Sequence, residues 1–159
     1  MHPITPCLWF NNQAEAAVNY YASVFKTARI GATMRYDKES AAVSGQAEGA
    51  VMTIEFELNG QPFLALNGGP HFKLNEAVSF IVKCDTQAEI DHYWDKLAGG
   101  GDASAQQCGW LKDRFGVSWQ VVPAVLPELL SGPNGGKVMQ ALLRMSKLDL
   151  ETLKRAHAG

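Results

Sequence analysis

The sequence predicts an α+β protein built from two similar modules, each with one strand, one helix and three further strands. Asn12 and Thr86 are each followed by Gln-Ala-Glu, so a polar residue twice stands three positions before a glutamate. In such a capping box, the cap oxygen and the glutamate satisfy free N–H groups where a helix starts. A short β-prone run precedes each cap, over residues 4–10 and 77–84. Internal repetition of this kind indicates the architecture before any single motif is weighed.

Both predicted helices have one apolar side. In the first helix the apolar residues recur at helical spacing, and in the second they form a matching stripe: Ala14, Ala17, Val18, Tyr21 and Phe25, then Ile90, Tyr93, Trp94 and Leu97. A stripe of this width packs one helix face against a sheet. The run Gly99-Gly100-Gly101 ends the second helix, because glycine accepts the left-handed cap conformation.

Three strands follow the first helix, over residues 29–36, 50–58 and 62–66. Asn59-Gly60 between the last two predicts a type I′ hairpin turn, since both residues tolerate positive φ. Residues 38–49 are rich in small and polar residues without periodicity, which predicts a mobile loop.

The second module repeats this order in a shorter form. Its strands are predicted at 105–111 and 117–122, around the turn Arg114-Phe115-Gly116, and its third strand has no clear position. Towards the end of the chain, Val138, Met139, Leu142 and Leu143 indicate a helix, and Ser146 to Asp149 the capped start of another. The expected organisation is a single domain, residues 1–159, with module one at 4–66, a linker at 67–76, module two at 77–123 and a helical tail at 124–159.

Composition restricts the possible partners. The chain has 159 residues and a net charge of −2 without a basic cluster, so nucleic acid is not an expected partner. The longest apolar runs are too short to cross a bilayer. Three cysteines without CxxC spacing favour reduced thiols, and the first residues lack signal-peptide features. We therefore expect a cytoplasmic protein without a membrane role.

Several segments resemble the PhnB-like branch of the vicinal oxygen chelate superfamily, which includes glyoxalase I, bleomycin resistance proteins and extradiol dioxygenases. Proteins of this branch often carry the name 3-demethylubiquinone-9 3-methyltransferase. The matching segments are Leu66 to Pro70, Ala77 to Phe80, Gln87 to Trp94, Gly100-Gly101, Cys108 to Asp113 and Phe115 to Gln120. The resemblance implies two curved sheets around a cavity, the glyoxalase/bleomycin resistance/dihydroxybiphenyl dioxygenase-like fold, and a homodimer.

The superfamily's enzymes hold a divalent metal with His and Glu from the first and last strands of each module. In this chain those positions fall at or next to Thr5, Leu64, Ser79 and Gln120. A catalytic metal needs about three good N or O ligands, which these side chains do not supply. We therefore predict no metal and no other cofactor. An alternative is a metal-dependent glyoxalase- or dioxygenase-type enzyme whose metal is held elsewhere, for example by His71 with Glu55 or Glu57.

Strand alternation predicts which side chains line the cavity. With Leu64, the candidate ligand-cavity residues are Thr5, Cys7, Trp9, Ser79, Ser118 and Gln120. Small hydroxyls, one amide and apolar walls suit a small, mostly neutral organic ligand, and the alternative is an ordinary packed sheet interior. Cys7 and Cys108 are the candidate nucleophiles, and an inert buried thiol is the favoured interpretation of Cys7.

The leading functional hypothesis is a protein that binds a small organic molecule without a tightly held metal, either as an enzyme or by sequestration as in bleomycin resistance. The family's methyltransferase name is disfavoured. S-adenosylmethionine is usually held by a glycine-rich turn after a parallel strand, and the only candidate, residues 45–49, has no strand ahead of it.

Overall fold

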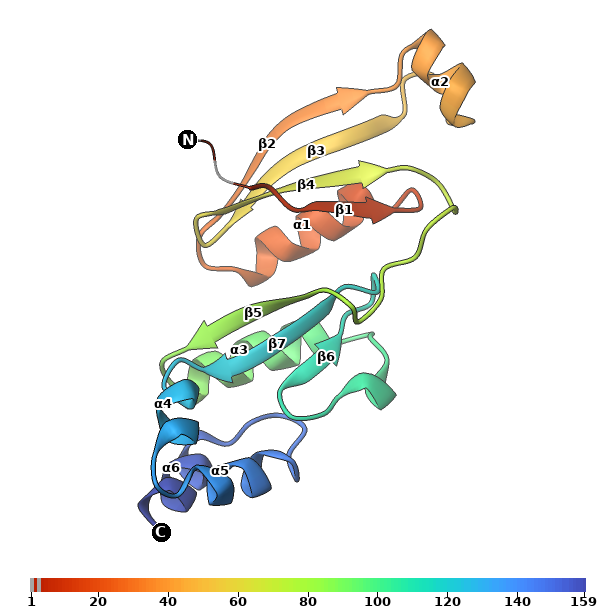
Figure 1. The fold of residues 1–159 in the computed structure, drawn as a ribbon. Coiled ribbons are helices and arrows are strands. Elements are labelled where there is room, and N and C mark those ends of the chain that lie inside the picture. Colours follow the sequence, from red (N-terminus) through yellow and green to blue (C-terminus); the bar gives the residue numbers. More distant parts are fainter. Residues whose placement is uncertain (1, 3) are drawn as a thin grey trace. The chain divides into compact units, whose positions relative to one another are not determined.

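The computed structural model describes residues 2 and 4–159 and divides into two compact units, the first ending at Leu74 and the second starting at Asn75. One unit contains a four-stranded sheet and the other a three-stranded sheet, and the chain ends in helices (Figure 1). This confirms the predicted mixed α+β class. No helix of the described residues is long and apolar enough to cross a membrane.

The first unit has a mixed sheet with strand order β1-β4-β3-β2. β1 runs parallel to β4, while the β3 pairings with β4 and β2 are antiparallel. Its elements are β1 (Cys7–Phe10), α1 (Ala14–Val24), β2 (Ala28–Arg35), α2 (Lys38–Ser44), β3 (Val51–Leu58) and β4 (Gln61–Asn67).

Side-chain alternation puts the apolar residues of this sheet under α1. Tyr21 of α1 is fully buried and stacks on Phe56 of β3, which in turn stacks on Phe63 of β4 with ring centroids 5.2 Å apart. The predicted hairpin turn is confirmed, because Asn59 and Gly60 both have positive φ, 48° and 83°.

The first predicted capping box does not form. Asn12 has φ of 61° and lies one residue before the N-cap, Gln13, whose side chain makes no cap hydrogen bond. Instead, the Ala14 N–H donates to Oδ1 of Asn67 at 3.0 Å. Nδ2 of the Asn67 side chain donates to the Val51 carbonyl at 3.2 Å, and the Tyr36 hydroxyl donates to the Asn67 carbonyl at 2.5 Å. A distant, buried asparagine therefore caps α1 and ties it to the sheet.

The mobile loop predicted at 38–49 is wrong over its first half, where the chain forms α2. Asp37 and Ser40 make a reciprocal capping box, with the Ser40 N–H 2.8 Å from Oδ1 of Asp37. These hydrogen bonds lower the pKa of Asp37. Gly45 ends the helix in the left-handed conformation, with φ of 73°. The prediction failed because serine, rather than Glu or Gln, stands at the third helical position.

The second unit has strand order β5-β7-β6, with β5 parallel and β6 antiparallel to β7. The capped start predicted at Thr86 is confirmed, since Thr86 Oγ1 accepts from the Glu89 N–H at 3.2 Å. The elements are β5 (Ser79–Cys84), α3 (Gln87–Ala98), the short 3-10 helix η1 (Ala103–Ala105), β6 (Trp110–Lys112), β7 (Ser118–Pro123), α4 (Leu126–Ser131), α5 (Gly135–Leu142) and α6 (Leu150–Ala158).

The strand predicted at 105–111 is largely wrong. Only Trp110–Lys112 forms a strand, and Gln107 makes an isolated bridge with Trp110. Cys108 and Gly109 both have positive φ, 53° and 84°, which breaks an extended strand. Among the described residues, the second sheet therefore has one strand before α3 and two after it. The further strand that the repeat predicted after α3, without a clear position, does not form among these residues.

The predicted C-terminal helices are confirmed as α5 and α6, and Asp149, the last residue of the predicted capped start, is the N-cap of α6. They pack into a second core around Leu148, Val138 and Leu153, each fully buried. The Gln87 side chain holds the segment between them, donating to the Leu148 carbonyl at 3.1 Å and accepting from the Leu150 N–H at 2.8 Å. The tail is thus an integral part of the second unit.

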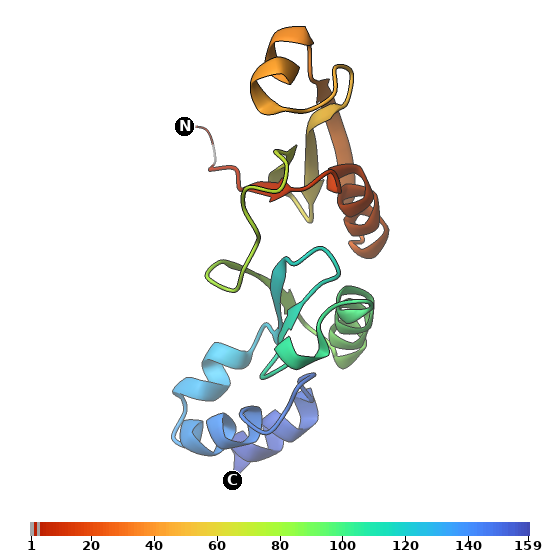
Figure 2. The same ribbon diagram turned by 90° about the vertical axis from the view of Figure 1, so that its right-hand side faces the viewer.

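In each unit, a long helix covers one sheet face. Figure 2 shows α1 on one side of the four-stranded sheet and α3 on one side of the three-stranded sheet. In each unit, the side chains that point away from the long helix therefore form the open face of the sheet. The strand residues that the sequence predicted to line a cavity lie on these two faces.

We predict that Asn67→Ala lowers the free energy of unfolding by about 2–4 kcal/mol, because it leaves the buried Ala14 N–H and Val51 carbonyl without their partner. Chemical denaturation followed by circular dichroism measures this change. The matched control is Asn11→Ala, an exposed asparagine in the turn before α1, with an expected change within about 0.5 kcal/mol. Equal effects of the two substitutions would contradict the capping role of Asn67.

Candidate functional site

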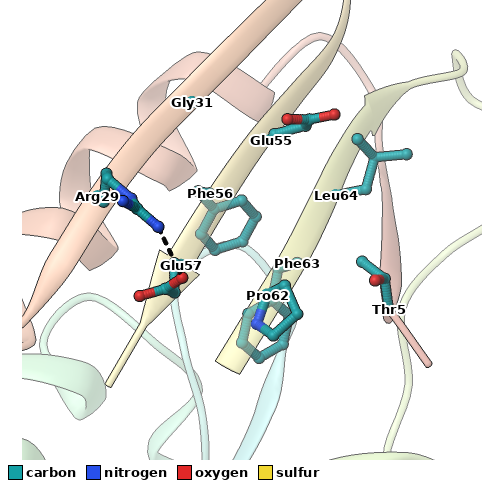
Figure 3. A pocket seen from close by; sticks show the side chains of 9 residues that line it. All are labelled: Thr5, Arg29, Gly31, Glu55, Phe56, Glu57, Pro62, Phe63 and Leu64. Atoms are coloured by element: carbon teal, nitrogen blue, oxygen red, sulfur yellow. Dashed lines mark hydrogen bonds and ion pairs between the residues drawn. The ribbon is translucent and has the colours of Figure 1, made fainter. Parts of the chain in front are cut away.

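A hollow of about 420 Å³ lies on the open face of the four-stranded sheet (Figure 3). Its lining comes from the neighbouring strands β2, β3 and β4 and from Thr5, which lies just before β1. The lining residues are Thr5, Arg29, Gly31, Glu55, Phe56, Glu57, Pro62, Phe63 and Leu64.

Two features of the sequence leave space for this hollow. Gly31 brings no side chain to β2, and a Cβ there would lie 3.2 Å from the Cβ of Glu55. The register of β2 on β3 also shifts between Ile30 and Thr33, and such irregularities bend a strand. The absence of a side chain at Gly31 and the bend of β2 therefore leave room on this face of the sheet.

The rim carries charge of both signs. Arg29 of β2 donates to Glu57 of β3 at 3.1 Å, and Figure 3 shows this ion pair at one end of the hollow. The pair is solvent-exposed, with 77% of the Arg29 side chain accessible, so it contributes little to stability and can rearrange. The exposed Glu55 stands farther along the same strand.

Two predicted cavity residues, Thr5 and Leu64, line this hollow. Cys7 pairs with Leu64 in the β1–β4 register. The residue is exposed, so the predicted buried thiol is wrong, although partial burial still raises the thiol pKa. A raised pKa keeps the thiol protonated at neutral pH and makes it a weak nucleophile.

Trp9, also predicted for the cavity, is packed by its own unit. Its indole N–H donates to the Gly69 carbonyl at 2.9 Å, and its ring meets Phe72 edge-on with centroids 4.9 Å apart. A Cβ at Gly68 would lie 2.3 Å from the indole ring, so only glycine fits there. The glycine-rich segment after β4 thus serves to hold Trp9.

The other three predicted residues meet on the open face of the three-stranded sheet. Gln120 Nε2 donates to Ser79 Oγ at 2.9 Å. Ser118 pairs in register with Ser79 on one side and with Lys112 on the other. Ser118 is only 2% exposed, and its hydroxyl has no hydrogen-bond partner among the described residues. Lys112, which the sequence did not single out for this site, forms an ion pair with Glu76.

A buried carboxylate fixes the turn that positions Ser118. Asp113, 2% exposed, accepts from the Phe115 and Val117 N–H groups at 2.8 and 3.0 Å, and from the Trp119 indole N–H at 2.9 Å. The predicted turn at Arg114-Phe115-Gly116 is thereby confirmed, with Gly116 at φ of 89°. The carboxylate satisfies the backbone of the β6–β7 connection and orients the start of β7.

The donors at the superfamily's metal positions do not suit a divalent metal. Leu64 lies on one sheet, with Thr5 just before its first strand, and Ser79 and Gln120 lie on the other sheet. None of the four is a carboxylate or imidazole. Among residues 2 and 4–159, no group of three His, Cys, Asp or Glu side chains is arranged to hold a metal. His71, the centre of the alternative metal site, therefore belongs to no such group.

A smaller hollow of about 350 Å³ is lined by Ala105, Gln107, Cys108 and Trp110. Cys108 is half-buried there, and its N–H donates to the Met145 carbonyl at 2.8 Å. The left-handed backbone of Cys108 is used to dock the C-terminal tail.

Sequence reasoning missed Arg29, Gly31, Pro62 and Lys112 as site residues. Alternation carried a usable signal, since each lies on the strand face opposite the apolar core residues. Identifying the hollow needed the strand order, which places β2 and β4 on either side of β3.

A model of the 3-demethylubiquinone-9 3-methyltransferase family matches residues 2–122. The PhnB protein from Bacillus cereus, which carries the same family name, is 35% identical, with a TM-score of 0.65 over 77% of this chain and 100% of that chain. Protein PA1353 from Pseudomonas aeruginosa is 20% identical, with a TM-score of 0.58 over 77% and 98% of the two chains. The fosfomycin resistance protein FosX from Mesorhizobium loti is 15% identical, with a TM-score of 0.56 over 82% and 97%. The last two share the fold alone, and no curated protein matches significantly.

We predict that Asp113→Asn destabilises the protein by about 1.5–3 kcal/mol, because an amide offers one acceptor oxygen where the carboxylate serves three donors with two. Thermal and chemical unfolding measure the change. Asp85→Asn, at an exposed aspartate before α3, is the control and is expected to stay within about 0.5 kcal/mol. A neutral Asp113→Asn would show that the carboxylate does not hold the turn.

Proposed function

Because this chain belongs to the 3-demethylubiquinone-9 3-methyltransferase family, a branch of the vicinal oxygen chelate superfamily, we propose that it binds a small organic molecule on its open sheet faces without a tightly held metal. The observation that carries this proposal is the hollow at Thr5 and Leu64. Its size is that of a small-molecule site.

The chemistry of the two open faces supports binding of an organic ligand. The first offers apolar surface from Leu64 and Pro62 beside the exposed charges of Arg29 and Glu55. The second offers hydroxyl and amide groups from Ser79, Ser118 and Gln120. A mainly apolar wall with a few polar groups is typical of ligand sites.

The donor set favours a metal-free site. Neutral Thr, Ser and Gln oxygens bind divalent metals weakly, and Leu64 cannot bind one at all. The Cys7 thiol, with its raised pKa, gives no strong nucleophile on the first face. Binding or sequestration is therefore the favoured activity.

The glycine-rich segment at 45–49 does not support the methyltransferase activity that the family name implies. Gly45 is the C-cap of α2, and the Gly49 N–H donates to the Tyr36 carbonyl at 2.7 Å. A cofactor-binding glycine turn instead follows a parallel strand and opens a helix. Here the segment follows a helix and leads into an antiparallel strand.

We also propose a homodimer, as the resemblance to the superfamily implied. The apolar residues of α5 and its C-cap, Leu143, are divided: Val138 and Leu142 are buried in the tail's own core, while Met139 and Leu143 are 41% and 57% exposed. The exposed pair leaves apolar surface for a partner. Sedimentation should therefore give a mass above that of a single 17.3 kDa chain at micromolar concentration, and a single-chain mass throughout would refute the dimer.

Gly31→Val tests the proposed binding, because the new side chain enters the hollow beside Glu55. We expect a library of metabolite-sized organic compounds, screened by ligand-observed NMR in EDTA, to contain compounds that bind the wild type. At least one of them should bind Gly31→Val about tenfold more weakly, a loss of about 1.4 kcal/mol.

Thr33→Val is the matched control, since it places the same side chain on β2 outside the hollow. S-adenosylmethionine belongs in the screen, and its binding would revive the methyltransferase alternative. An absence of binders in EDTA, or binding that is seen only when EDTA is left out, would contradict the proposal.

A further inference from the structure

The open face of the three-stranded sheet contains a hydroxyl that the fold leaves unsatisfied. Ser118 Oγ is buried and lacks a hydrogen-bond partner among the described residues. Burial of an unpaired hydroxyl is unfavourable, and native proteins rarely retain one without a use. The neighbouring hydroxyl of Ser79 is different, because it accepts from Gln120.

The groups around Ser118 carry positive charge and hydrogen-bond donors. Lys112 is the register partner of Ser118 on β6, so both side chains emerge on the same sheet face. Only 23% of the Lys112 side chain is exposed. A half-buried ammonium beside an unsatisfied hydroxyl is a pair of donors suited to an oxyanion.

A carboxylate of the chain already neutralises this charge. Glu76 pairs with Lys112 and is itself 59% exposed, in the segment that enters β5. Since β7 lies between β5 and β6, the ion pair crosses β7 at the end where Ser118 lies. The Lys112 hydrogen bond also lowers the pKa of Glu76, which keeps the carboxylate charged.

The other nearby carboxylate has a different task. Asp102 Oδ1 accepts from the Ser104 N–H at 2.9 Å and from the Ser104 hydroxyl at 2.7 Å. These bonds cap η1 and are the main reason that the pKa of Asp102 is lowered. Glu76 is therefore the carboxylate that occupies Lys112.

We propose that Lys112, Ser118 and the Ser79–Gln120 pair form a receptor for the carboxylate of a small organic acid, and that Glu76 occupies this receptor until the acid displaces it. Displacement swings the exposed Glu76 side chain away from β7 and uncovers the Ser118 hydroxyl, which then donates to the incoming carboxylate. The step exchanges one ion pair for another, without covalent change.

The same face indicates what the rest of the acid is made of. Ile81 is 55% exposed and pairs in register with Gln120, which pairs on its other side with Trp110. An apolar or aromatic group attached to the carboxylate can lie against these two side chains. The sequence predicted a mostly neutral ligand. For this face we propose an acid with an apolar body instead. The inference rests on the proposed function in taking the ligand to be a small organic molecule.

Benzoate and its neutral analogue benzamide test this inference by NMR titration of the full chain. Benzoate should bind saturably and benzamide at least about tenfold more weakly, because charge-assisted hydrogen bonds are the stronger ones. Glu76→Gln should tighten benzoate binding by about three- to tenfold, since it removes an intramolecular competitor. Benzamide binding should not respond. Glu48→Gln, an exposed glutamate in the first unit, is the control and should change neither affinity.

Two further variants separate the receptor from a purely structural ion pair. Lys112→Met should weaken benzoate binding by about tenfold or more, and Lys112→Arg should restore most of it. Ser118→Ala should weaken benzoate binding yet raise the unfolding midpoint by about 2–4 °C, because it removes the unsatisfied hydroxyl.

Equal binding of benzoate and benzamide, with no effect of Glu76→Gln, would overturn the carboxylate receptor and leave the proposed binding function standing. Lack of benzoate binding by both the wild type and Glu76→Gln would overturn the inference as well. Failure of the proposed function itself is seen separately, as the absence of any binder in the library screen against the hollow at Gly31.

Discussion

Each sheet of this protein is covered by a long helix on one face, and the remaining structure depends on that constraint. A strand alternates its side chains between two environments. The apolar half of β3 and β4 packs under α1, with Tyr21, Phe56 and Phe63 stacked in sequence. The other half is then free to carry groups that would be costly in a core, such as Glu55 or Arg29. Apolar packing is thus confined to one face of the sheet, and the charged side chains lie on the other.

Buried polar side chains support this division at the strand ends. In the first unit Asn67 joins the end of β4 to the start of α1 and to β3. In the second unit Asp113 closes the turn from β6 to β7 and holds Trp119. Both satisfy backbone N–H groups that would otherwise be buried without partners. Ser118, across the turn from Asp113, is the contrast: it is equally buried, yet its hydroxyl has no hydrogen-bond partner among the described residues.

The sequence predicted the parts of the fold that follow from local rules. The stripes of both long helices, the Asn59-Gly60 turn and the cap at Thr86 all depend on neighbours within a few residues. The failures have non-local or less common causes. Asn67, 53 residues away, caps α1 in place of the expected local box. The short helix α2 uses a serine in its capping box, and the left-handed Cys108 interrupts an otherwise strand-like run. For the site, strand alternation predicted Thr5 and the Ser79–Ser118–Gln120 group, and the family resemblance pointed to Leu64. The contribution of Arg29, Gly31 and Lys112 depends on which strands are neighbours, which the residues alone did not specify.

The composition of the protein as it is isolated tests metal-free binding of a small organic molecule most directly. Native mass spectrometry of freshly purified protein, combined with elemental analysis for Zn, Ni, Mn and Fe, measures both bound metal and retained organic molecules. Metal-free binding predicts metal far below one equivalent per chain and, where a molecule is retained, the mass of a small organic acid. Stoichiometric metal would contradict it, because the donors at Thr5, Leu64, Ser79 and Gln120 do not supply a metal site.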